Sequence, residues 1–309
     1  MKITAAMVKE LREMTGAGVM ACKNALTETD GDFDKAVEVL REKGQATAEK
    51  KAGRIAAEGT VLAVVKGETT GVIVEVNSET DFVAKNEKFR TFVAKVADTI
   101  FANDAKTVEE LADAKWIDDE AKSVKEELVE QIATIGENMS IRRFEKIAAE
   151  NGIVVPYIHA AGRIGVLVEA ETDVVNDEVK EALKNVAMQV AAMNAKYVSE
   201  DEIDADYIAK EKEILTAAAR NEKPDANDKI INGMVMGRIK KELKEICLLD
   251  QVYVKAEDGK QSVGKYVESV AKAVGATIKV KKFVRYETGE GIEKKEEDFA
   301  AEVAKQMGN

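Results

Sequence analysis

The sequence predicts an α+β protein that begins with short helices. Three observations support this fold class. The first 54 residues show helical apolar spacing, two pairs of β-branched strand patterns each lead into a helix, and two charged helical stretches follow. A chain of 309 residues is long enough for two or more domains with hydrophobic cores of their own.

Residues 1–54 are expected to form a small three-helix domain with a linker. Thr4 can cap a first helix, Val19 begins a second, and Phe33 begins a third that ends near Gly44. The remaining residues up to 54 are expected to form an exposed linker. Because three short helices give a marginal core, such a module is more often a recognition unit than a catalytic one.

Residues 55–140 are expected to form the first half of an α+β core. Strand patterns at 59–65 and 71–76 flank a turn and predict a hairpin, and a helix is expected from about Asn86 to Phe101. A charged helical region follows to about residue 136. Between the hairpin and the helix lies a polar loop with a single aromatic residue.

Residues 141–198 repeat this arrangement. Strand patterns at 153–159 and 165–170 predict a second hairpin, and a helix is expected from Asn176 onwards. The repetition indicates internal duplication of a hairpin plus helix. The sequence therefore predicts a core of two similar subdomains.

The two copies differ in the loop between hairpin and helix. Thr80-Asp81-Phe82-Val83 of the first copy corresponds to Thr172-Asp173-Val174-Val175 of the second. A turn needs only its Thr and Asp for capping, so the shared architecture does not explain the aromatic residue. Phe82 either folds back into the core or projects toward a partner.

Residues 199–251 are expected to form a helical hairpin inserted into the core. Its arms run from about 201 to 221 and from about 228 to 247, with a turn at Pro224. Apolar residues of the second arm recur at steps of four, at Ile231, Val235, Ile239, Leu243 and Cys247. Such a stripe packs on its partner arm or forms a dimer contact, and the pattern leaves both open.

Residues 252–309 are expected to form a C-terminal module. Its elements are a helix at 263–274, a strand at 276–286 that can return to one of the earlier sheets, and an amphipathic helix at 298–306.

Composition and charge limit the class of partner. The chain is 45% hydrophobic and 34% charged, which is typical of an ordered, soluble protein, and its formal net charge is -12. Nucleic-acid-binding surfaces normally show a basic stripe, and only two short basic runs are present, at 50–54 and 279–282. We therefore expect no direct contact with nucleic acid.

Scarce residues argue against an enzyme. His159 is the only histidine, so a Ser-His-Asp triad or a multi-histidine metal site has very little to draw on. Cys22 and Cys247 stand far apart without a CxxC motif and are expected to be free, buried thiols. We expect no catalytic residues, no metal and no cofactor.

The sequence shows no targeting signal. Residues 1–4 lack the apolar core of a signal peptide, and no apolar run reaches the roughly 18 residues that a membrane-spanning helix needs. These observations predict a cytoplasmic protein without a membrane partner.

Several motifs together resemble the bacterial elongation factor Ts family, and they span nearly the whole chain in the family's order. They lie at residues 8–18, 31–33, 39–44, 75–86, 136–139, 157–159, 165–168 and 289–294. The resemblance implies an N-terminal domain like the ubiquitin-associated (UBA) domain, two similar core subdomains, a helical hairpin and a C-terminal helical module.

The resemblance also implies guanine nucleotide exchange on elongation factor Tu during translation elongation. In the family, the Asp and Phe of a Thr-Asp-Phe-Val motif wedge near the magnesium site of the partner's GTP-binding domain. They disturb the metal and phosphate contacts and release GDP, so that GTP can bind. The matching residues are Thr80, Asp81, Phe82 and Val83.

Further partner contacts are implied by position. The regions of Arg12, Val19, Met20 and Tyr266 correspond to contacts with the GTP-binding domain. The region of His159 is implied to face another domain of the partner. A homodimer and a 2:2 complex with elongation factor Tu both stay open.

Two departures from the family pattern concern the helical hairpin. Val252 follows Gln251 where the family commonly has Pro, and the segment between Pro224 and Gly237 is a few residues longer than expected. Hairpin length and hairpin-mediated dimerisation are therefore open, while the exchange motif is unaffected. The competing function is a non-catalytic adaptor, with a UBA-like head on a binding scaffold.

Overall fold

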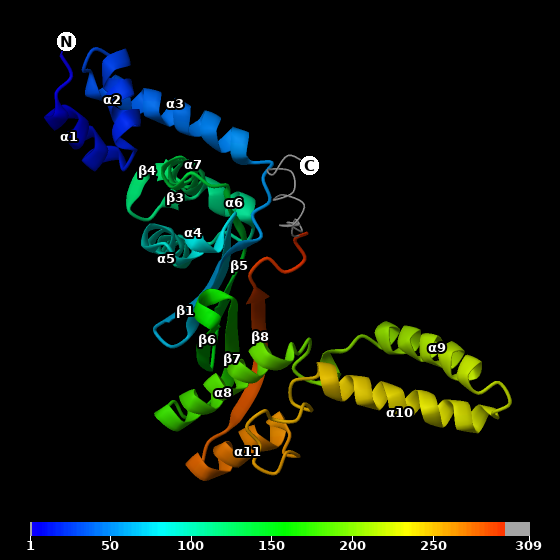
Figure 1. The fold of residues 1–309 in the computed structure, drawn as a ribbon. Helices are drawn as coiled ribbons and strands as arrows, with labels where there is room; N and C mark the ends of the chain where they lie inside the picture. Colours follow the sequence, from blue (N-terminus) through cyan, green and yellow to red (C-terminus); the bar gives the residue numbers. More distant parts are fainter. Residues whose placement is uncertain (1, 294–309) are drawn as a thin grey trace. The chain divides into compact units, whose positions relative to one another are not determined.

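The computed structural model describes residues 2–293 and divides the chain into two compact units. Unit 1 takes the described residues of Met1–Leu62, Val74–Glu145 and Glu287–Asn309, and unit 2 takes Ala63–Ile73 and Lys146–Tyr286. Helices and antiparallel strands occur in both (Figure 1), so the α+β class is confirmed. The finer division into five domains stays a prediction. The helix predicted at 298–306 lies outside the described residues.

Three helices open unit 1: α1 (Ala5–Thr15), α2 (Val19–Glu28) and α3 (Phe33–Lys51). The Thr4 hydroxyl caps α1 by accepting a hydrogen bond from the Met7 backbone N–H. Leu11, Cys22 and Leu26 are fully buried in a small core that the three helices share. All three helices begin where the sequence predicted.

Helix α3 does not end near Gly44, as predicted, but continues to Lys51. Gly44 lies inside the helix and faces α7 (Val124–Ile135). A Cβ added there would lie 3.6 Å from Ala133 Cβ and 3.8 Å from Val129 Cγ1. The glycine therefore marks a close approach of two helices, and most of the predicted linker is helical.

A three-stranded sheet follows, with β1 (Glu58–Lys66), β2 (Thr70–Ser78) and β5 (Met139–Ala148) in the order β1-β2-β5. The β1–β2 hairpin was predicted and β5 was not. Strand β5 was missed because its sequence is rich in charge. Arg142 and Arg143 on β5 bind the carboxylate of Glu75 on β2, so the charges serve an ionic group inside the fold.

Helices and a small sheet connect β2 to β5. They are α4 (Asp81–Lys85), α5 (Glu87–Ala102), α6 (Val108–Asp113), β3 (Lys115–Trp116), β4 (Asp119–Ser123) and α7. Helix α5 begins after Asn86, as predicted. The β3–β4 hairpin lies in a region that was predicted to be helical throughout. Trp116 on β3 is buried and stacks on Phe92 of α5, with ring centroids 5.7 Å apart, which fixes this hairpin on the helix.

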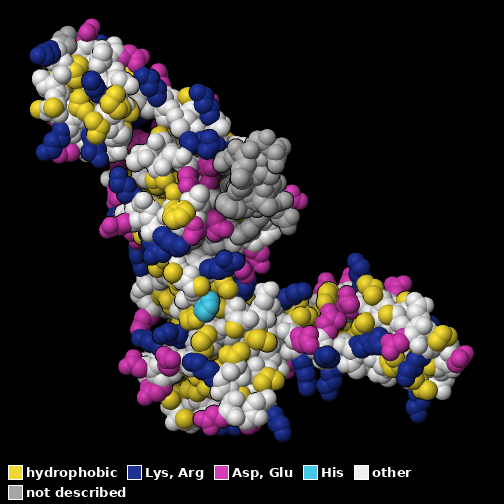
Figure 2. Space-filling model, in the orientation of Figure 1, with side chains coloured by type: hydrophobic (Ala, Val, Ile, Leu, Met, Phe, Trp, Pro, Cys, Tyr) yellow, Lys and Arg dark blue, Asp and Glu magenta, His cyan; other side chains and the backbone are white. Residues whose placement is uncertain are grey.

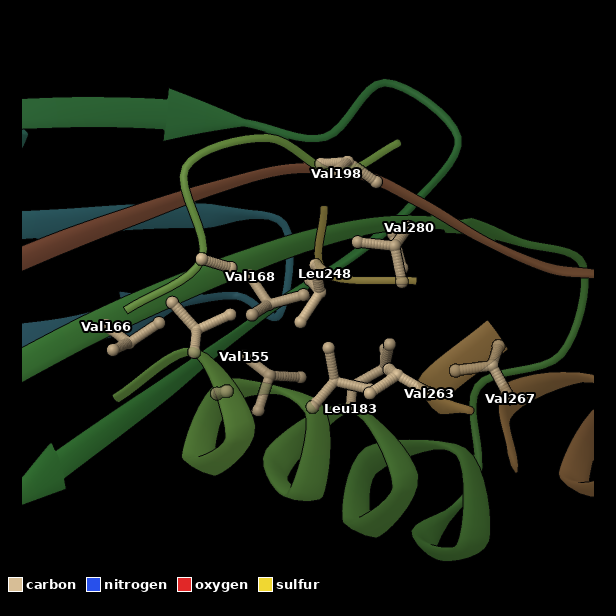
Figure 3. Packing of buried hydrophobic residues seen from close by; sticks show 14 of the residues in the cluster. Val155, Val166, Val168, Leu183, Val198, Leu248, Val263, Val267 and Val280 are labelled. Carbon is tan, nitrogen blue, oxygen red and sulfur yellow. The ribbon is translucent and has the colours of Figure 1, made fainter. Parts of the chain in front are cut away.

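Unit 2 is built on β6 (Gly152–His159), β7 (Ile164–Thr172) and β8 (Ile278–Glu287), in the order β6-β7-β8. Strands β6 and β7 pair antiparallel with Val155 opposite Val168. Figure 3 shows these valines packed with Leu183 of α8 (Asp177–Met193), which covers the sheet. The second hairpin, its helix and the returning strand are confirmed.

Two helices form the predicted helical hairpin, α9 (Ala205–Glu222) and α10 (Asp228–Ile246) (Figure 1). Ile231, Val235 and Ile239 of α10 are buried with Ala219 of α9. The apolar stripe of the second arm therefore packs on the first arm within the chain.

The remaining helix of unit 2, α11 (Val263–Val274), has the predicted bounds. Ser262 caps its start, and Gly275 ends it with φ 67°, in the left-handed region that glycine adopts readily. Its buried residues Val263 and Val267 join the core that α8 covers.

The two cysteines agree with the sequence analysis. Cys22 and Cys247 are buried free thiols, and burial raises the pKa of Cys247 to about 11. In the described part of the chain, no helix combines the length and the apolar character needed to cross a bilayer.

The Glu75 carboxylate is a fully buried ionic group of unit 1. Its Oε1 accepts hydrogen bonds from the Gly289 N–H (2.8 Å), Arg142 Nη1 (3.0 Å) and Asn77 Nδ2 (3.1 Å), and its Oε2 accepts one from Arg143 Nε (2.6 Å). Burial alone would raise the pKa of Glu75, but these donors and the two positive charges together hold the pKa below its usual value.

We expect Glu75→Gln to lower the free energy of unfolding by about 2 kcal/mol, because two arginines lose their buried charge partner. The lowered pKa of Glu75 also sets the pH dependence. Its stabilising contribution is fully present above the unfolded-state pKa and is lost as pH falls through the lower folded-state pKa. Urea unfolding at neutral pH and at a series of acidic pH values measures both effects.

Glu120→Gln is the matched control, because it removes an exposed pair with Lys115 at 3.5 Å. Its unfolding free energy should change by less than about 0.5 kcal/mol. Equal stabilities of the two variants would show that the buried carboxylate contributes no more than a surface charge.

Candidate functional site

The segment Thr80-Asp81-Phe82-Val83 opens α4, a single helical turn between β2 and α5. The Thr80 hydroxyl oxygen caps the turn by accepting a hydrogen bond from the Val83 N–H (3.4 Å). Val83 is buried, whereas Phe82 is 81% exposed. Of the two alternatives for Phe82, the structure shows the one in which it projects into solvent.

Asp81 stands beside Phe82 on the exposed side of the turn. Lys85, one turn later, donates a hydrogen bond to Asp81 Oδ2 at 2.6 Å. This hydrogen bond and the lysine charge hold the pKa of Asp81 below its usual value, so Asp81 is ionised at neutral pH. Because exposed pairs of this kind are weak, Asp81 can exchange Lys85 for another donor.

The turn is also held by the carboxylate of Glu137, which was not among the predicted site residues. Glu137 accepts a hydrogen bond from the Thr80 N–H at 3.0 Å and another from the Thr80 hydroxyl at 2.7 Å. Residues 136–139 matched a family motif, but the two partners are 57 positions apart in the sequence. No local pattern could have shown that they meet.

The corresponding loop of the second copy shares two hydrogen bonds with the first, since Ser78 donates to the Thr80 carbonyl and Glu79 accepts from the Asn138 N–H in the same way, but it lacks the helical turn. The Thr172 hydroxyl donates to the Val174 carbonyl at 2.9 Å, and Asp173 accepts a hydrogen bond from the Thr277 N–H at 2.7 Å. No helical turn forms between β7 and α8, and Val174 is half-buried. The exposed aromatic on a capped turn is therefore specific to the first copy.

The predicted N-terminal contact residues lie on the surface of α1 and α2. Arg12 is exposed, and so are Val19 and Met20 at the start of α2. Met14 is exposed near them in the chain, and Figure 2 shows hydrophobic side chains gathered on the visible face of this region. An apolar surface of this kind is suited to docking on another protein.

The two predicted residues of unit 2 have different surroundings. His159 is exposed at the end of β6, and its Nδ1 lies 3.1 Å from the Tyr157 hydroxyl. Tyr266 is half-buried on α11, stacks on Tyr253 with ring centroids 4.2 Å apart, and accepts a hydrogen bond from Asn185 Nδ2 at 2.9 Å. His159 is thus accessible, whereas Tyr266 mainly supports its own unit.

Within residues 2–293, no group of three or more His, Cys, Asp or Glu side chains is placed to hold a metal ion. A cavity of about 640 Å³ lies between α3 and α7, with Leu40 and Val129 among its lining residues, and Phe82 is not part of it. The turn itself offers an apolar ring and an ionised carboxylate. These groups are suited to contact with another protein's surface.

Because Phe82 is exposed, Phe82→Ala is expected to change the free energy of unfolding by less than about 0.5 kcal/mol. Phe89→Ala is the matched comparison, since Phe89 on α5 is fully buried, and its loss should cost about 3 kcal/mol or more. Urea unfolding of both variants measures the difference. A loss for Phe82→Ala as large as that for Phe89→Ala would make Phe82 a core residue.

Comparisons with known proteins agree with these observations. A family model described as "Elongation factor TS" matches residues 79–290, which include the turn. Elongation factor Ts of Clostridium botulinum (strain Eklund 17B / Type B) is 54% identical over 308 residues, that of Clostridium perfringens (strain SM101 / Type A) 55% over 308, and that of Clostridium novyi (strain NT) 54% over 307. Each match covers 99% of both chains. The chain therefore belongs to the elongation factor Ts family.

Proposed function

We propose that this protein is the guanine nucleotide exchange factor of elongation factor Tu and that Asp81 and Phe82 are its wedge. Its family makes it a translation elongation factor, which acts in protein biosynthesis. The observation that carries the finer proposal is the 81% exposure of Phe82 on a capped turn, beside an ionised carboxylate. A large aromatic held in solvent is most simply explained by a partner that buries it.

Phe82 supplies the apolar part of the wedge. Burying its ring in the GTP-binding domain of elongation factor Tu would contribute on the order of 2 kcal/mol. The ring accelerates GDP release only if the nucleotide-free partner binds it better than the GDP-bound partner does. Each 1.4 kcal/mol of that difference shifts the equilibrium about tenfold.

Asp81 supplies the polar part. Placed near the magnesium site of elongation factor Tu, its negative charge competes for the donors that hold the metal and the phosphates. Its weak pairing with Lys85 leaves the carboxylate free to make that exchange. The protein therefore acts by displacing contacts, with no covalent step and no cofactor of its own.

Other surfaces provide affinity in this proposal. The exposed Arg12, Val19 and Met20 of the UBA-like head contact the same GTP-binding domain, and the exposed His159 contacts another domain. Tyr266 has weaker support, because it packs within unit 2. The complex forms in the cytoplasm, and both a homodimer of this protein and a 2:2 assembly with elongation factor Tu stay open.

Release of a fluorescent GDP analogue from elongation factor Tu tests the proposal. We expect micromolar wild-type protein to accelerate the release, and Phe82→Ala to slow the accelerated rate by about tenfold or more because the wedge is lost. Ile117→Ala is the matched control, since it truncates another exposed apolar side chain of unit 1, and it should leave the rate unchanged.

Two outcomes would contradict the proposal. A wild-type protein that binds elongation factor Tu without accelerating GDP release would be an adaptor. A Phe82→Ala variant as active as Ile117→Ala would remove the wedge from the mechanism.

A further inference from the structure

The carboxylates of Glu79 and Glu137 join the loop after β2 to the segment after α7, because each accepts hydrogen bonds from the other segment. Glu137 accepts hydrogen bonds from both the N–H (3.0 Å) and the hydroxyl (2.7 Å) of Thr80. In return, Glu79 Oε1 accepts a hydrogen bond from the Asn138 N–H at 2.6 Å. Each segment thus supplies the acceptor for a backbone donor of the other. We call the residues Glu79, Thr80, Glu137 and Asn138 the crossed clamp.

The crossed clamp holds Thr80, the N-cap residue of α4. The Thr80 hydroxyl donates its proton to Glu137 and accepts a hydrogen bond from the Val83 N–H with one of its two lone pairs. Helix α4 has five residues and is too short to be stable on its own. Phe82 is exposed and is not held by packing of its own ring. The position of the Phe82 backbone therefore depends on this cap and on the buried side chain of Val83.

The second copy keeps one half of this clamp and lacks the other. Asp173 accepts a hydrogen bond from the N–H of Thr277, just before β8, as Glu79 does from the N–H of Asn138, just before β5. The Thr172 hydroxyl at the end of β7 donates to the Val174 carbonyl, as the Ser78 hydroxyl at the end of β2 donates to the Thr80 carbonyl, but the chain then passes into α8 without a helical turn. Ala276 lies two residues before β8, where Glu137 lies two residues before β5, so the second connection forms without a carboxylate in the position of Glu137. The Glu137–Thr80 half of the clamp is therefore an addition to the copy that exposes Phe82.

The clamp is also tied to the end of α3 and the residues after it. Lys51 Nζ donates to the Gly136 carbonyl at 2.6 Å, and Asn138 Nδ2 donates to the Arg54 carbonyl at 2.7 Å. Arg54 Nη1 lies 3.5 Å from Glu79 Oε2. The segment that contacts Thr80 is therefore itself hydrogen-bonded to the end of α3 and the residues after it, and these contacts restrict its movement.

We propose that Glu137 is a positioning residue for nucleotide exchange, which holds the Asp81–Phe82 turn in its projecting conformation through Thr80. This inference rests on the proposed exchange function and adds a residue that does not itself meet the partner's nucleotide site. Pre-organisation of this kind removes the cost of ordering the turn when the partner binds. Loss of this pre-organisation lowers the rate of GDP release more than it lowers the affinity of the other surfaces for the partner.

The test compares Glu137→Ala and Glu137→Gln with wild type. The rate of release of a fluorescent GDP analogue from elongation factor Tu is measured against increasing concentrations of each variant. We expect Glu137→Ala to lower the maximal rate about tenfold, with a smaller change in the half-saturating concentration. Glu137→Gln should recover most of the rate, because its amide can still accept from the Thr80 N–H and bond the hydroxyl.

Glu126→Ala is the matched control. Glu126 holds the N–H (2.8 Å) and the hydroxyl (3.2 Å) of the cap residue Ser123 at the other end of α7. It is the same kind of cap contact, made to a different helix. We expect Glu126→Ala to lower the melting temperature about as much as Glu137→Ala and to leave the maximal exchange rate unchanged.

Amide hydrogen exchange on the free protein gives a second readout. The Thr80 amide should be protected in wild type and lose at least tenfold of its protection in Glu137→Ala. Should Glu137→Ala fail to fold, Glu137→Asp replaces it, because the shortened side chain cannot hold both Thr80 donors. The same losses of rate and protection are then expected, in smaller amount.

The outcomes separate the two proposals. A folded Glu137→Ala or Glu137→Asp variant with the wild-type maximal rate overturns the positioning role alone. An unprotected Thr80 amide in wild type does the same. A wild-type protein that fails to accelerate GDP release overturns the exchange function, and the positioning role with it.

Discussion

The buried carboxylate of Glu75 is the constraint on which unit 1 depends. Four donors from β2, β5 and the turn after β8 converge on it, and each has to be in place for the charge to be tolerated away from water. Gly289 shows how tight the arrangement is, since a Cβ there would lie 2.1 Å from the Ala57 carbonyl oxygen. The end of β2 is thereby fixed where the chain enters the turn at Thr80–Val83.

The next residues of the chain include Phe82, whose exposed side chain contributes little to the folding stability of the protein. Val83 and the Thr80 cap hold the turn, the crossed clamp holds Thr80, and Phe82 is left in solvent. In the proposed function, the apolar surface of Phe82 contributes free energy only when a partner buries it. The separation of the anchoring residues Thr80 and Val83 from Phe82 explains how the aromatic can be exposed without loosening the core.

Elements whose patterns are local could be predicted from the sequence. The bounds of α11 and the starts of α1, α2, α3 and α5 follow from caps and helical spacing. Strand β5 was missed because its arginines look solvent-exposed until the buried Glu75 is known. Gly44 was misread as a helix end because its helix partner is distant in sequence.

The candidate site, like the fold, could be predicted from the sequence only in part. The motif at Thr80–Val83 was found from the comparison of the two copies and from family resemblance. The exposure of Phe82, the pairing of Asp81 with Lys85 and the contact of Glu137 with Thr80 depend on the folded backbone, since Glu137 and Thr80 are 57 residues apart in the sequence. Contacts of that range leave no periodic trace in the sequence.

A double-mutant cycle on the maximal rate of GDP release tests the central claim most directly, by combining Glu137→Ala with Phe82→Ala. If Glu137 acts only by positioning the wedge, the loss in the double variant will be clearly smaller than the product of the two single losses, because only the contribution of Asp81 is left for Glu137 to affect. If the two losses multiply instead, Glu137 and Phe82 act independently, and the turn is not the device through which the carboxylate works.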